Sequence, residues 1–279
     1  MYEPMTYKDR VVWITGASSG IGEALAIRMA ERGAKLILSA RNQAELNRVA
    51  CECDSKGAAT ALVLPLDIAE HASLKGKAGD VLEQFGHIDF LLNNAGVSQR
   101  SFCVDTAFTV YEQMFSINVL GQIALTQAVL PAMVARGEGH IAVTASIAGK
   151  LGAPQRTGYC AAKHAVMGFF DALRTEVAGD GIRVTTITPG FIRTNVAVNA
   201  LDAAGERTGK EDPYISDGMD VGECARVIME GLADGIPEIA VGSGAEMDLV
   251  RARQEDPIGT FKLLAAMATQ IRSAQPSAT

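Results

Sequence analysis

The sequence contains little of what marks several special classes of protein. Its five cysteines are scattered and odd in number, which argues against a disulfide framework and indicates free thiols in a reducing compartment. Cys51 and Cys53 lie close together but have no second pair of ligands, so we predict no metal site. No basic block stands out, and 32 acidic residues outnumber 25 basic ones. Nucleic acid is therefore not an expected partner.

Long apolar runs are also missing from the sequence. No stretch approaches the ~20 residues that a membrane-spanning helix needs. Residues 1–10 are polar and have no signal-peptide core. We therefore expect a cytoplasmic protein without a membrane span. What is present is an ordinary globular composition, with 48% hydrophobic and 20% charged residues over 279 positions, which fits one large α/β domain.

A glycine-rich loop follows the first apolar run. Residues 11–15 are typical of a buried strand, and residues 23–32 have the pattern of a helix that ends at Gly33. Between them the glycines are spaced Gly-x3-Gly-x-Gly. Such a loop lets the backbone approach a pyrophosphate, and the first amides of the helix then point at the phosphates. The alternative is a strand-to-helix turn without a ligand, which the agreement of loop and flanking elements disfavours.

A second motif lies in the middle of the chain. Tyr159 and Lys163 are four residues apart, which on a helix places both side chains on one face. An ammonium group favours the ionised form of a neighbouring phenol, so the tyrosine could exchange protons near neutral pH. Ser146 ends the apolar run 140–146, where its hydroxyl could bind a substrate oxygen. Because Tyr-x3-Lys pairs are common on helix surfaces, this motif has weight only together with the glycine loop.

In this order along the chain, the motifs resemble those of the short-chain dehydrogenase/reductase family. The matching residues are Thr15, Gly16, Gly20 and Gly22 in the glycine motif, Asn93 to Gly96 as Asn-Asn-Ala-Gly, then Asn118, Ser146, Tyr159 and Lys163, and finally Pro189 and Gly190. The resemblance covers roughly residues 8–245. Stretches at 11–15, 98–101 and 159–164 further resemble the member 7 branch, which includes carbonyl reductases of steroids and retinoids.

The resemblance implies an α/β fold with a single doubly wound Rossmann domain. Seven mainly parallel strands are expected in the order 3-2-1-4-5-6-7, with helices on both faces. The runs that fit these strands are 11–15, 35–40, 60–66, 88–92, 140–146, 182–188 and 238–241. The longer predicted helices cover 43–56, 105–136, 159–178 and 221–233. Family members commonly form homodimers or homotetramers, so we expect contacts through helices around 105–135 and 159–178.

The resemblance also implies roles for individual residues. The expected catalytic residues are Asn118, Ser146, Tyr159 and Lys163. The residues expected to contact the cofactor are Gly16, Ser18, Ser19, Gly20, Ile21, Gly22, Arg41, Asn42, Asp67, Ile68, Asn94, Ala95, Gly96, Tyr159, Lys163, Pro189, Gly190, Ile192 and Thr194. Asn93 is expected to bridge strands. For Asn118 a structural hydrogen bond is the alternative to holding a water that links Lys163 to solvent.

The end of the second predicted strand bears on the choice of cofactor. Rossmann proteins that prefer NAD place an acidic residue there to hold the ribose 2′-hydroxyl. This chain has Ala40 followed by Arg41, whose guanidinium can bind a 2′-phosphate. We therefore predict NADP(H) over NAD(H), with Ser18 and Asn42 as helpers. Alternatively, Arg41 caps the loop or stacks on the adenine, which would suit either cofactor.

The last part of the chain departs from the shorter members of the family. We assign residues 1–245 to the Rossmann domain, with a substrate lid at about 195–218. Residues 246–279 form an extension whose stretch 258–271 is apolar on one side. We expect this extension to pack on the body or on a partner, and a membrane surface is the remaining alternative.

The expected activity is NADP(H)-dependent interconversion of a carbonyl and a secondary alcohol. In reduction Tyr159 would give its proton to the oxygen, Ser146 would hold that oxygen, and Lys163 would lower the tyrosine pKa and hold the ribose. The substrate expected by default is an apolar ketone, an aldehyde or a steroid-like molecule, because the lid has no cluster of charge. Alternatives are a 3-oxoacyl thioester reductase, a non-catalytic NADP(H) sensor, and epimerisation or dehydration with a bound cofactor.

Overall fold

The computed structural model describes residues 6–274, and its centre is a seven-stranded sheet. The strands lie in the order β3-β2-β1-β4-β5-β6-β7, and every pair is parallel. Their bounds are β1 (Val11–Thr15), β2 (Lys35–Ser39), β3 (Thr60–Val63), β4 (Phe90–Asn93), β5 (Gly139–Thr144), β6 (Ile182–Pro189) and β7 (Glu238–Val241). The predicted doubly wound α/β architecture and strand order are therefore confirmed.

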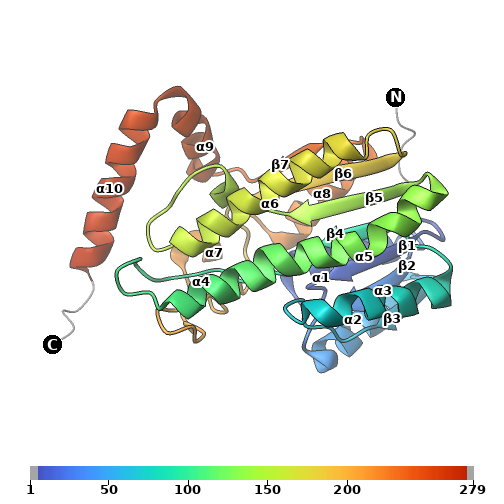
Figure 1. Ribbon diagram of the computed structural model, residues 1–279. Coiled ribbons are helices and arrows are strands. Elements are labelled where there is room, and N and C mark those ends of the chain that lie inside the picture. The colour runs from blue at the N-terminus through green and yellow to red at the C-terminus, as the bar shows by residue number, and fades with distance from the viewer. Residues whose placement is uncertain (1–5, 275–279) are drawn as a thin grey trace.

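Helices cover both faces of this sheet, as Figure 1 shows. They are α1 (Gly20–Ala30), α2 (Gln43–Lys56), α3 (His71–Phe85), α4 (Phe108–Phe115), α5 (Gly121–Arg136), α6 (Thr157–Glu176), α7 (Pro213–Ser216), α8 (Val221–Ala233), α9 (Ala245–Glu255) and α10 (Pro257–Ser273), with a π-helical turn η1 (Ser116–Leu120) and a 3₁₀ turn η2 (Ile147–Gly149). One buried cluster packs α3, α4, α5 and α6 against one face of the sheet. A second packs α1, α2 and α8 against the other face.

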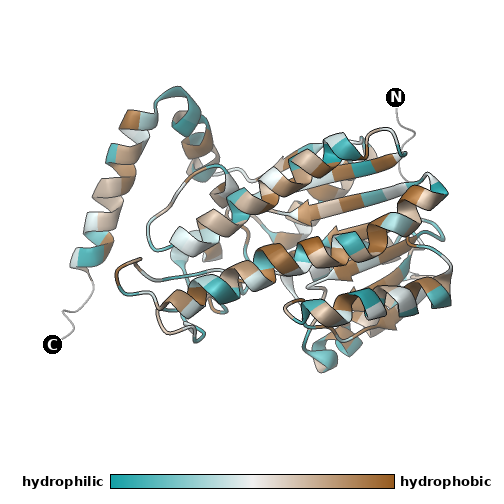
Figure 2. Cartoon of the chain, in the orientation of Figure 1, coloured by the Kyte–Doolittle hydropathy of each residue, from teal (hydrophilic) through white to brown (hydrophobic). Residues whose placement is uncertain are grey.

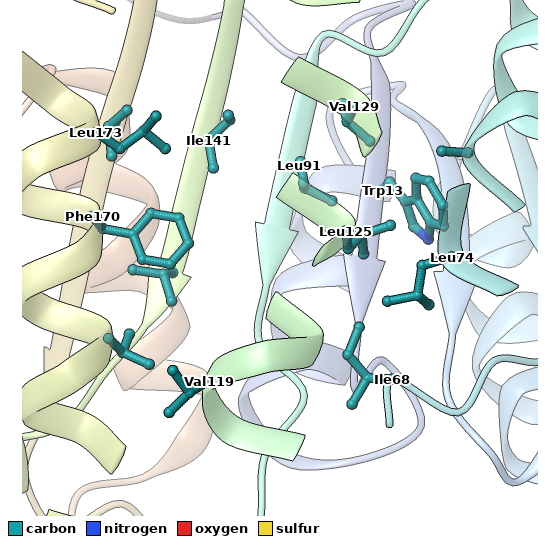
Figure 3. Close-up of a cluster of buried hydrophobic side chains, with 14 of the residues drawn as sticks. Trp13, Ile68, Leu74, Leu91, Val119, Leu125, Val129, Ile141, Phe170 and Leu173 are labelled. Atoms are coloured by element: carbon teal, nitrogen blue, oxygen red, sulfur yellow. The ribbon is translucent and has the colours of Figure 1, made fainter. Parts of the chain in front are cut away.

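The strands are mostly apolar because helices cover both faces of the sheet. β1 is buried over its whole length, and the Trp13 indole nitrogen donates to the Ser39 hydroxyl at 2.9 Å. Figure 2 shows the hydrophobic colour concentrated on the strands. In Figure 3, Leu125 and Val129 of α5 lie beside Leu91 of β4. This packing holds the carboxyl ends of the strands, and the loops that leave them, at one edge.

Several predicted boundaries were wrong by a few residues, and local chemistry explains some of them. The third strand ends at Val63 instead of residue 66, although Leu64 N and Leu66 N still donate to Leu38 O and Ala40 O at 2.9 and 3.0 Å. The fifth strand ends at Thr144, because Ser146 caps the turn η2. The predicted strand 88–92 begins at Phe90, and the helix expected from 105 begins at Phe108.

The helix expected from 105 is also interrupted by the π-helical turn η1. The run Phe108–Arg136 is long and apolar enough by composition to cross a membrane, yet half of its most apolar window is buried within this fold. Valine and leucine side chains of α5 take part in the core cluster beneath the sheet. A helix that packs on a sheet in this way needs an apolar face.

Two segments border the edge where the strands end. The segment 195–218, expected as a lid, lies along the loop after β4: Arg100 N donates to Leu201 O, and Leu201 N donates to Ser98 O, both at 2.8 Å. The α9–α10 pair projects from the body at this edge (Figure 1). In α10 Leu264 is buried, whereas Ile258 is 69% exposed. The extension therefore touches the body along one side, and residues 275–279 lie outside the described part.

Candidate active site

The glycine loop between β1 and α1 is shaped for close approach of a ligand. Gly16 and Gly20 have φ of 67° and 60°, in the left-handed region that glycine tolerates. A Cβ on Gly22 would collide with the Gly16 carbonyl oxygen. The Asn94 side-chain amide donates to Thr15 O and Gly16 O at 3.2 and 3.3 Å, which ties the loop to the end of β4. No side chain caps the start of α1, so its first amides are available to a phosphate.

A cavity of about 1620 Å³ begins at this loop and follows the carboxyl edge of the sheet. Of the residues predicted to bind cofactor or to act in catalysis, all but Gly22 and Asn118 line it. Gly22 packs beneath the loop, and the Asn118 side chain is fully buried. The structure therefore gathers residues from across the sequence around one space.

The residues expected to choose the cofactor follow the ends of β2 and β3 and line the same cavity as the glycine loop. Arg41 is 56% exposed, and its nearest guanidinium nitrogen lies 4.0 Å from a carboxylate oxygen of Asp67. The Asn42 side chain caps α2 by accepting from Glu45 N at 3.3 Å. Asp67 accepts from Ala69 N at 2.9 Å, so it forms a local turn and is not the cap of α3. Arg41 is thus the cation with room to meet a ligand here.

Asn118 lies in the π-helical turn η1, where a bend was expected. Its side-chain oxygen accepts from Val97 N at 3.0 Å, and its amide donates to Val97 O at 2.9 Å. A Cβ on the neighbouring Gly96 would lie 2.6 Å from that side-chain oxygen and 3.7 Å from Lys163 Nζ. The side chain therefore has the structural role that was the alternative reading, and a water relay remains a prediction. Asn93 was expected to bridge strands, but it donates to Thr126 of α5 at 3.0 Å.

Ser146, Tyr159 and Lys163 converge at the end of β5. Ser146 Oγ accepts from Ala148 N at 3.1 Å and donates to Pro189 O at 3.4 Å, so the turn η2 and strand β6 both hold it. Tyr159 lies in the first turn of α6, with Lys163 one turn later. Lys163 Nζ donates to Thr144 O at 2.7 Å and lies 5.7 Å from the centre of the tyrosine ring. The ammonium therefore lies between the strand end and the phenol.

The electrostatics of this group differ from the sequence-based expectation. Burial raises the pKa of Tyr159 above its ordinary value, although a hydrogen bond with Ser146 and the charge of Arg156 act to lower it. Burial also lowers the pKa of Lys163 to about 8. The expectation that Lys163 brings the tyrosine pKa below its usual value is therefore wrong for this structure. Desolvation of the phenol outweighs the favourable charges.

The comparisons agree with this geometry. A family model described as short chain dehydrogenase matches residues 10–204, which is more than half of the chain. The protein is a short-chain dehydrogenase/reductase. It is 43% identical over 235 residues to human dehydrogenase/reductase SDR family member 7, covering 83% of this chain and 69% of that protein. It is 38% identical over 273 residues to a Drosophila melanogaster family protein 7-like, covering 97% of this chain and 84% of that one. It therefore lies near the member 7 branch.

Solved structures of other family members have the same fold. A short-chain dehydrogenase/reductase from Burkholderia phymatum, in complex with NAD, has a TM-score of 0.80 at 27% identity and covers 90% of this chain and 95% of its own. An alcohol dehydrogenase from Thermococcus sibiricus, complexed with 5-hydroxy-NADP, has a TM-score of 0.73 at 26% identity, covering 85% and 97%. The family binds nicotinamide cofactors, and the open glycine loop with its uncapped helix fits such a group.

Sequence reasoning missed several residues of this dehydrogenase/reductase. The buried Gln99 accepts from Gly158 N at 2.7 Å and from Tyr159 N at 3.4 Å, so it caps α6 from another segment. Arg100 and Arg156 line the cavity, and both form ion pairs with Asp212. The stretch 98–101 had been noted as a resemblance, but no spacing rule places it beside residue 158.

The extension contributes to the cavity of this enzyme fold. Leu264, Met267 and Ile271 lie on one face of α10 and line the cavity. At the base of α9, the Glu246 carboxylate accepts from Gly244 N at 3.3 Å and from Phe191 N at 3.5 Å. Among residues 6–274, no group of three or more His, Cys, Asp or Glu gathers that could hold a metal ion.

Proposed function

We propose that this protein is an NADP(H)-dependent oxidoreductase that interconverts a carbonyl and a secondary alcohol, with Tyr159 as its acid and base. The observation that carries the proposal is the convergence of Ser146, Tyr159 and Lys163 on the cavity that begins at the glycine loop. A bound nicotinamide would supply or accept the hydride at the substrate carbon. The chain supplies placement, proton transfer and a desolvated site.

In the reductive direction Ser146, Tyr159 and Lys163 each have a separate role. Ser146 turns its hydroxyl from Pro189 O, where its bond is long at 3.4 Å, to the substrate oxygen. Tyr159 donates its phenolic proton to the same oxygen as negative charge develops there. Lys163, which donates to Thr144 O at 2.7 Å, stabilises the resulting phenolate and would hold the ribose of a bound cofactor. In the oxidative direction the phenolate takes the proton back.

Arg41 supports the choice of NADP(H). Its half-exposed guanidinium is free to turn toward a 2′-phosphate, and Ala40 leaves the strand end without the carboxylate that would repel one. Asp67 is a weak counterion at 4.0 Å, so Arg41 would exchange it for a 2′-phosphate, which is the stronger partner. One of the two solved relatives is in complex with NAD and the other with 5-hydroxy-NADP, so they favour neither choice.

The walls at the catalytic end of the cavity support an apolar carbonyl substrate. They include Leu151 after η2, Phe191 after β6 and Leu264 of α10. Burying such a substrate would remove apolar surface from water on both sides, which stabilises binding at roughly 25 cal/mol per Å². A ketone, an aldehyde or a steroid-like molecule meets this condition.

Oxidation of NADPH by the purified protein tests this function. The substrates are a panel of ketosteroids, aromatic ketones, aldehydes and 3-oxoacyl thioesters, with NADH in parallel. We expect a ketone or aldehyde to be reduced, and Tyr159→Phe to reduce turnover by about 10² or more while NADPH affinity stays within a few-fold. Retained turnover in Tyr159→Phe would contradict the acid–base role. Tight NADPH binding without turnover of any substrate in the panel would favour the alternative of a non-catalytic NADP(H) sensor.

A further inference from the structure

The α9–α10 hairpin projects from the body, yet it contacts the body at both of its ends (Figure 1). At the start of α9 the buried Glu246 carboxylate accepts from Phe191 N at 3.5 Å, just past the end of β6. At the end of α10 the Arg272 guanidinium lies 4.6 Å from the centre of the Phe102 ring, which belongs to the β4–α4 loop. The hairpin thus connects two loops that leave the carboxyl edge of the sheet.

One face of α10 is turned toward the cavity. Leu264, Met267 and Ile271 are spaced i, i+3 and i+7, which places them on one side of the helix, and all three line the cavity. Leu264 is buried, whereas Met267 and Ile271 are only half-buried. An apolar side chain that borders a cavity in this way stays partly in water until an apolar ligand covers it. This face is therefore suited to contact with an apolar molecule in the cavity.

The same face lies at the catalytic end of the cavity. Leu264 lines a groove together with Ala153, Pro154 and Cys160, which lie on either side of Tyr159 in the sequence. The residues expected to choose the cofactor follow β2 and β3, in the other half of the sheet. The cavity volume of about 1620 Å³ exceeds the roughly 300–1,000 Å³ typical of a site for one small molecule. A second molecule therefore has room beside a dinucleotide.

We propose that α10 is the outer wall of the substrate end of the cavity, and that Leu264, Met267 and Ile271 select carbonyl substrates with a long apolar body. This rests on the proposed function and adds to it the size and polarity of the substrate. A small aldehyde would occupy only the space beside the catalytic group. A long apolar chain would also cover the three side chains of α10, and each methylene buried there strengthens binding by up to about fourfold.

Reduction of a series of 2-alkanones, from 2-butanone to 2-octanone, tests the proposal. The readout is kcat/KM in NADPH oxidation by the full chain, and we expect it to rise with chain length. Met267→Gln keeps an unbranched side chain and a good helix former but places an amide on the wall. The ratio of kcat/KM for 2-octanone to that for 2-butanone should fall about tenfold, because the amide must lose water when the chain covers it. An unchanged ratio would overturn the proposal.

Two further variants separate the wall from its attachment. Met267→Trp narrows the cavity, so the same ratio should fall through a higher KM for 2-octanone. Phe102→Leu keeps an apolar side chain but removes the ring beside Arg272, and the ratio should fall by about two- to fivefold. A loss confined to kcat, equal for both ketones, would contradict a role in selecting the substrate.

Leu263→Gln is the matched control. It makes the same kind of replacement on the same helix, at a side chain that is 51% exposed and lies outside the face formed by Leu264, Met267 and Ile271. The ratio should stay at the parent value. A fall equal to that in Met267→Gln would show that the replacements act through the stability of α10, which would overturn the proposal. Thermal unfolding shows whether each variant folds, and if Met267→Gln does not, the ratio in Ile271→Gln decides.

Binding measurements distinguish failure of this proposal from failure of the proposed function. Ligand-detected NMR titration of the complex with NADP⁺ gives the affinity for each ketone without turnover. We expect 2-octanone to bind more tightly than 2-butanone, and Met267→Gln to reduce the difference. If this holds although no ketone is reduced, the proposed function fails and the wall stands. If ketones are reduced but neither binding nor kcat/KM depends on chain length, the wall is refuted and the proposed function stands.

Discussion

At the scale of single residues, opposing forces act on Tyr159. Its place at the cavity wall removes water from the phenol and raises its pKa, while Ser146 and Arg156 act in the other direction. In this structure the tyrosine is therefore neutral near neutral pH, which is the state that its proposed role as proton donor requires. Lys163, with a pKa of about 8, is still mostly protonated there. Reduction of a carbonyl needs this protonation state.

Arg41 is the residue on which the cofactor prediction depends. Arg41→Ala is expected to weaken NADPH binding by about tenfold or more, because a charge-assisted pair with the 2′-phosphate is worth roughly 1.5–3 kcal/mol. NADH binding should change little, since that cofactor has no such phosphate. Fluorescence titration with both cofactors measures the two affinities. Arg226→Ala, which removes a surface arginine paired with Glu223 and Glu230 away from the cavity, is the matched control. Equal losses for NADPH and NADH would contradict the prediction.

At the scale of elements, the start of α6 depends on a residue far away in the sequence. The helix places Tyr159 in its first turn, where its amides have no partner within the helix. Gln99 supplies the missing acceptor for Gly158 N and also donates to Ser101 Oγ at 3.2 Å. The direction of the tyrosine is thereby coupled to the loop after β4.

Gln99→Leu should expose this dependence. It keeps much of the volume but leaves a buried amide without an acceptor, which costs about 1–3 kcal/mol of unfolding free energy. We expect turnover to fall while NADPH affinity stays within a few-fold, since the glycine loop is unaffected. Urea unfolding and steady-state kinetics measure the two effects, and Gln84→Leu on the exposed side of α3 is the control. A parallel loss of cofactor binding would show that the cap does not act on Tyr159 specifically.

At the scale of the whole molecule, the buried sheet limits stability in acid. His140 of β5 is 1% exposed, and its Nε2 is 2.9 Å from Thr185 Oγ1. Burial, and then the charge of Arg183, lowers its pKa from 6.5 to about 3. The folded state therefore keeps His140 neutral where the unfolded chain already binds a proton.

The sign of the pH dependence follows from this difference. Below about pH 6.5 the unfolded state takes up the proton first, so stability is lost as the pH falls toward 3, by about 3 kcal/mol between pH 6.5 and 4. Urea unfolding at a series of pH values measures this slope. In His140→Gln it should be flatter, whereas His164→Gln on α6 should leave it in place. An unchanged slope in His140→Gln would assign the acid sensitivity to other groups.

The sequence by itself indicated most of the strands, the glycine loop and the spacing of Tyr159 and Lys163. These features depend on local patterns: apolar runs bounded by glycines, and a fixed spacing along a helix. The order of the strands and the set of residues expected around the cofactor followed from the resemblance to the family. Most strand residues lie beneath helices, so their apolar character marks a strand without knowledge of its neighbours. The cytoplasmic location and the preference for NADP(H) remain predictions from composition and from Arg41, and the homo-oligomer remains one from the resemblance.

Tertiary structure alone decided the contacts between segments far apart in the chain. Gln99 reaches Gly158, and Asp212 reaches Arg100 and Arg156, across separations that no helical or strand period encodes. The direction of the Tyr159 pKa was also decided there, because it depends on how much water the surrounding elements exclude. Spacing reveals which groups can meet along one helix, but burial and partners from other elements decide what charge they carry.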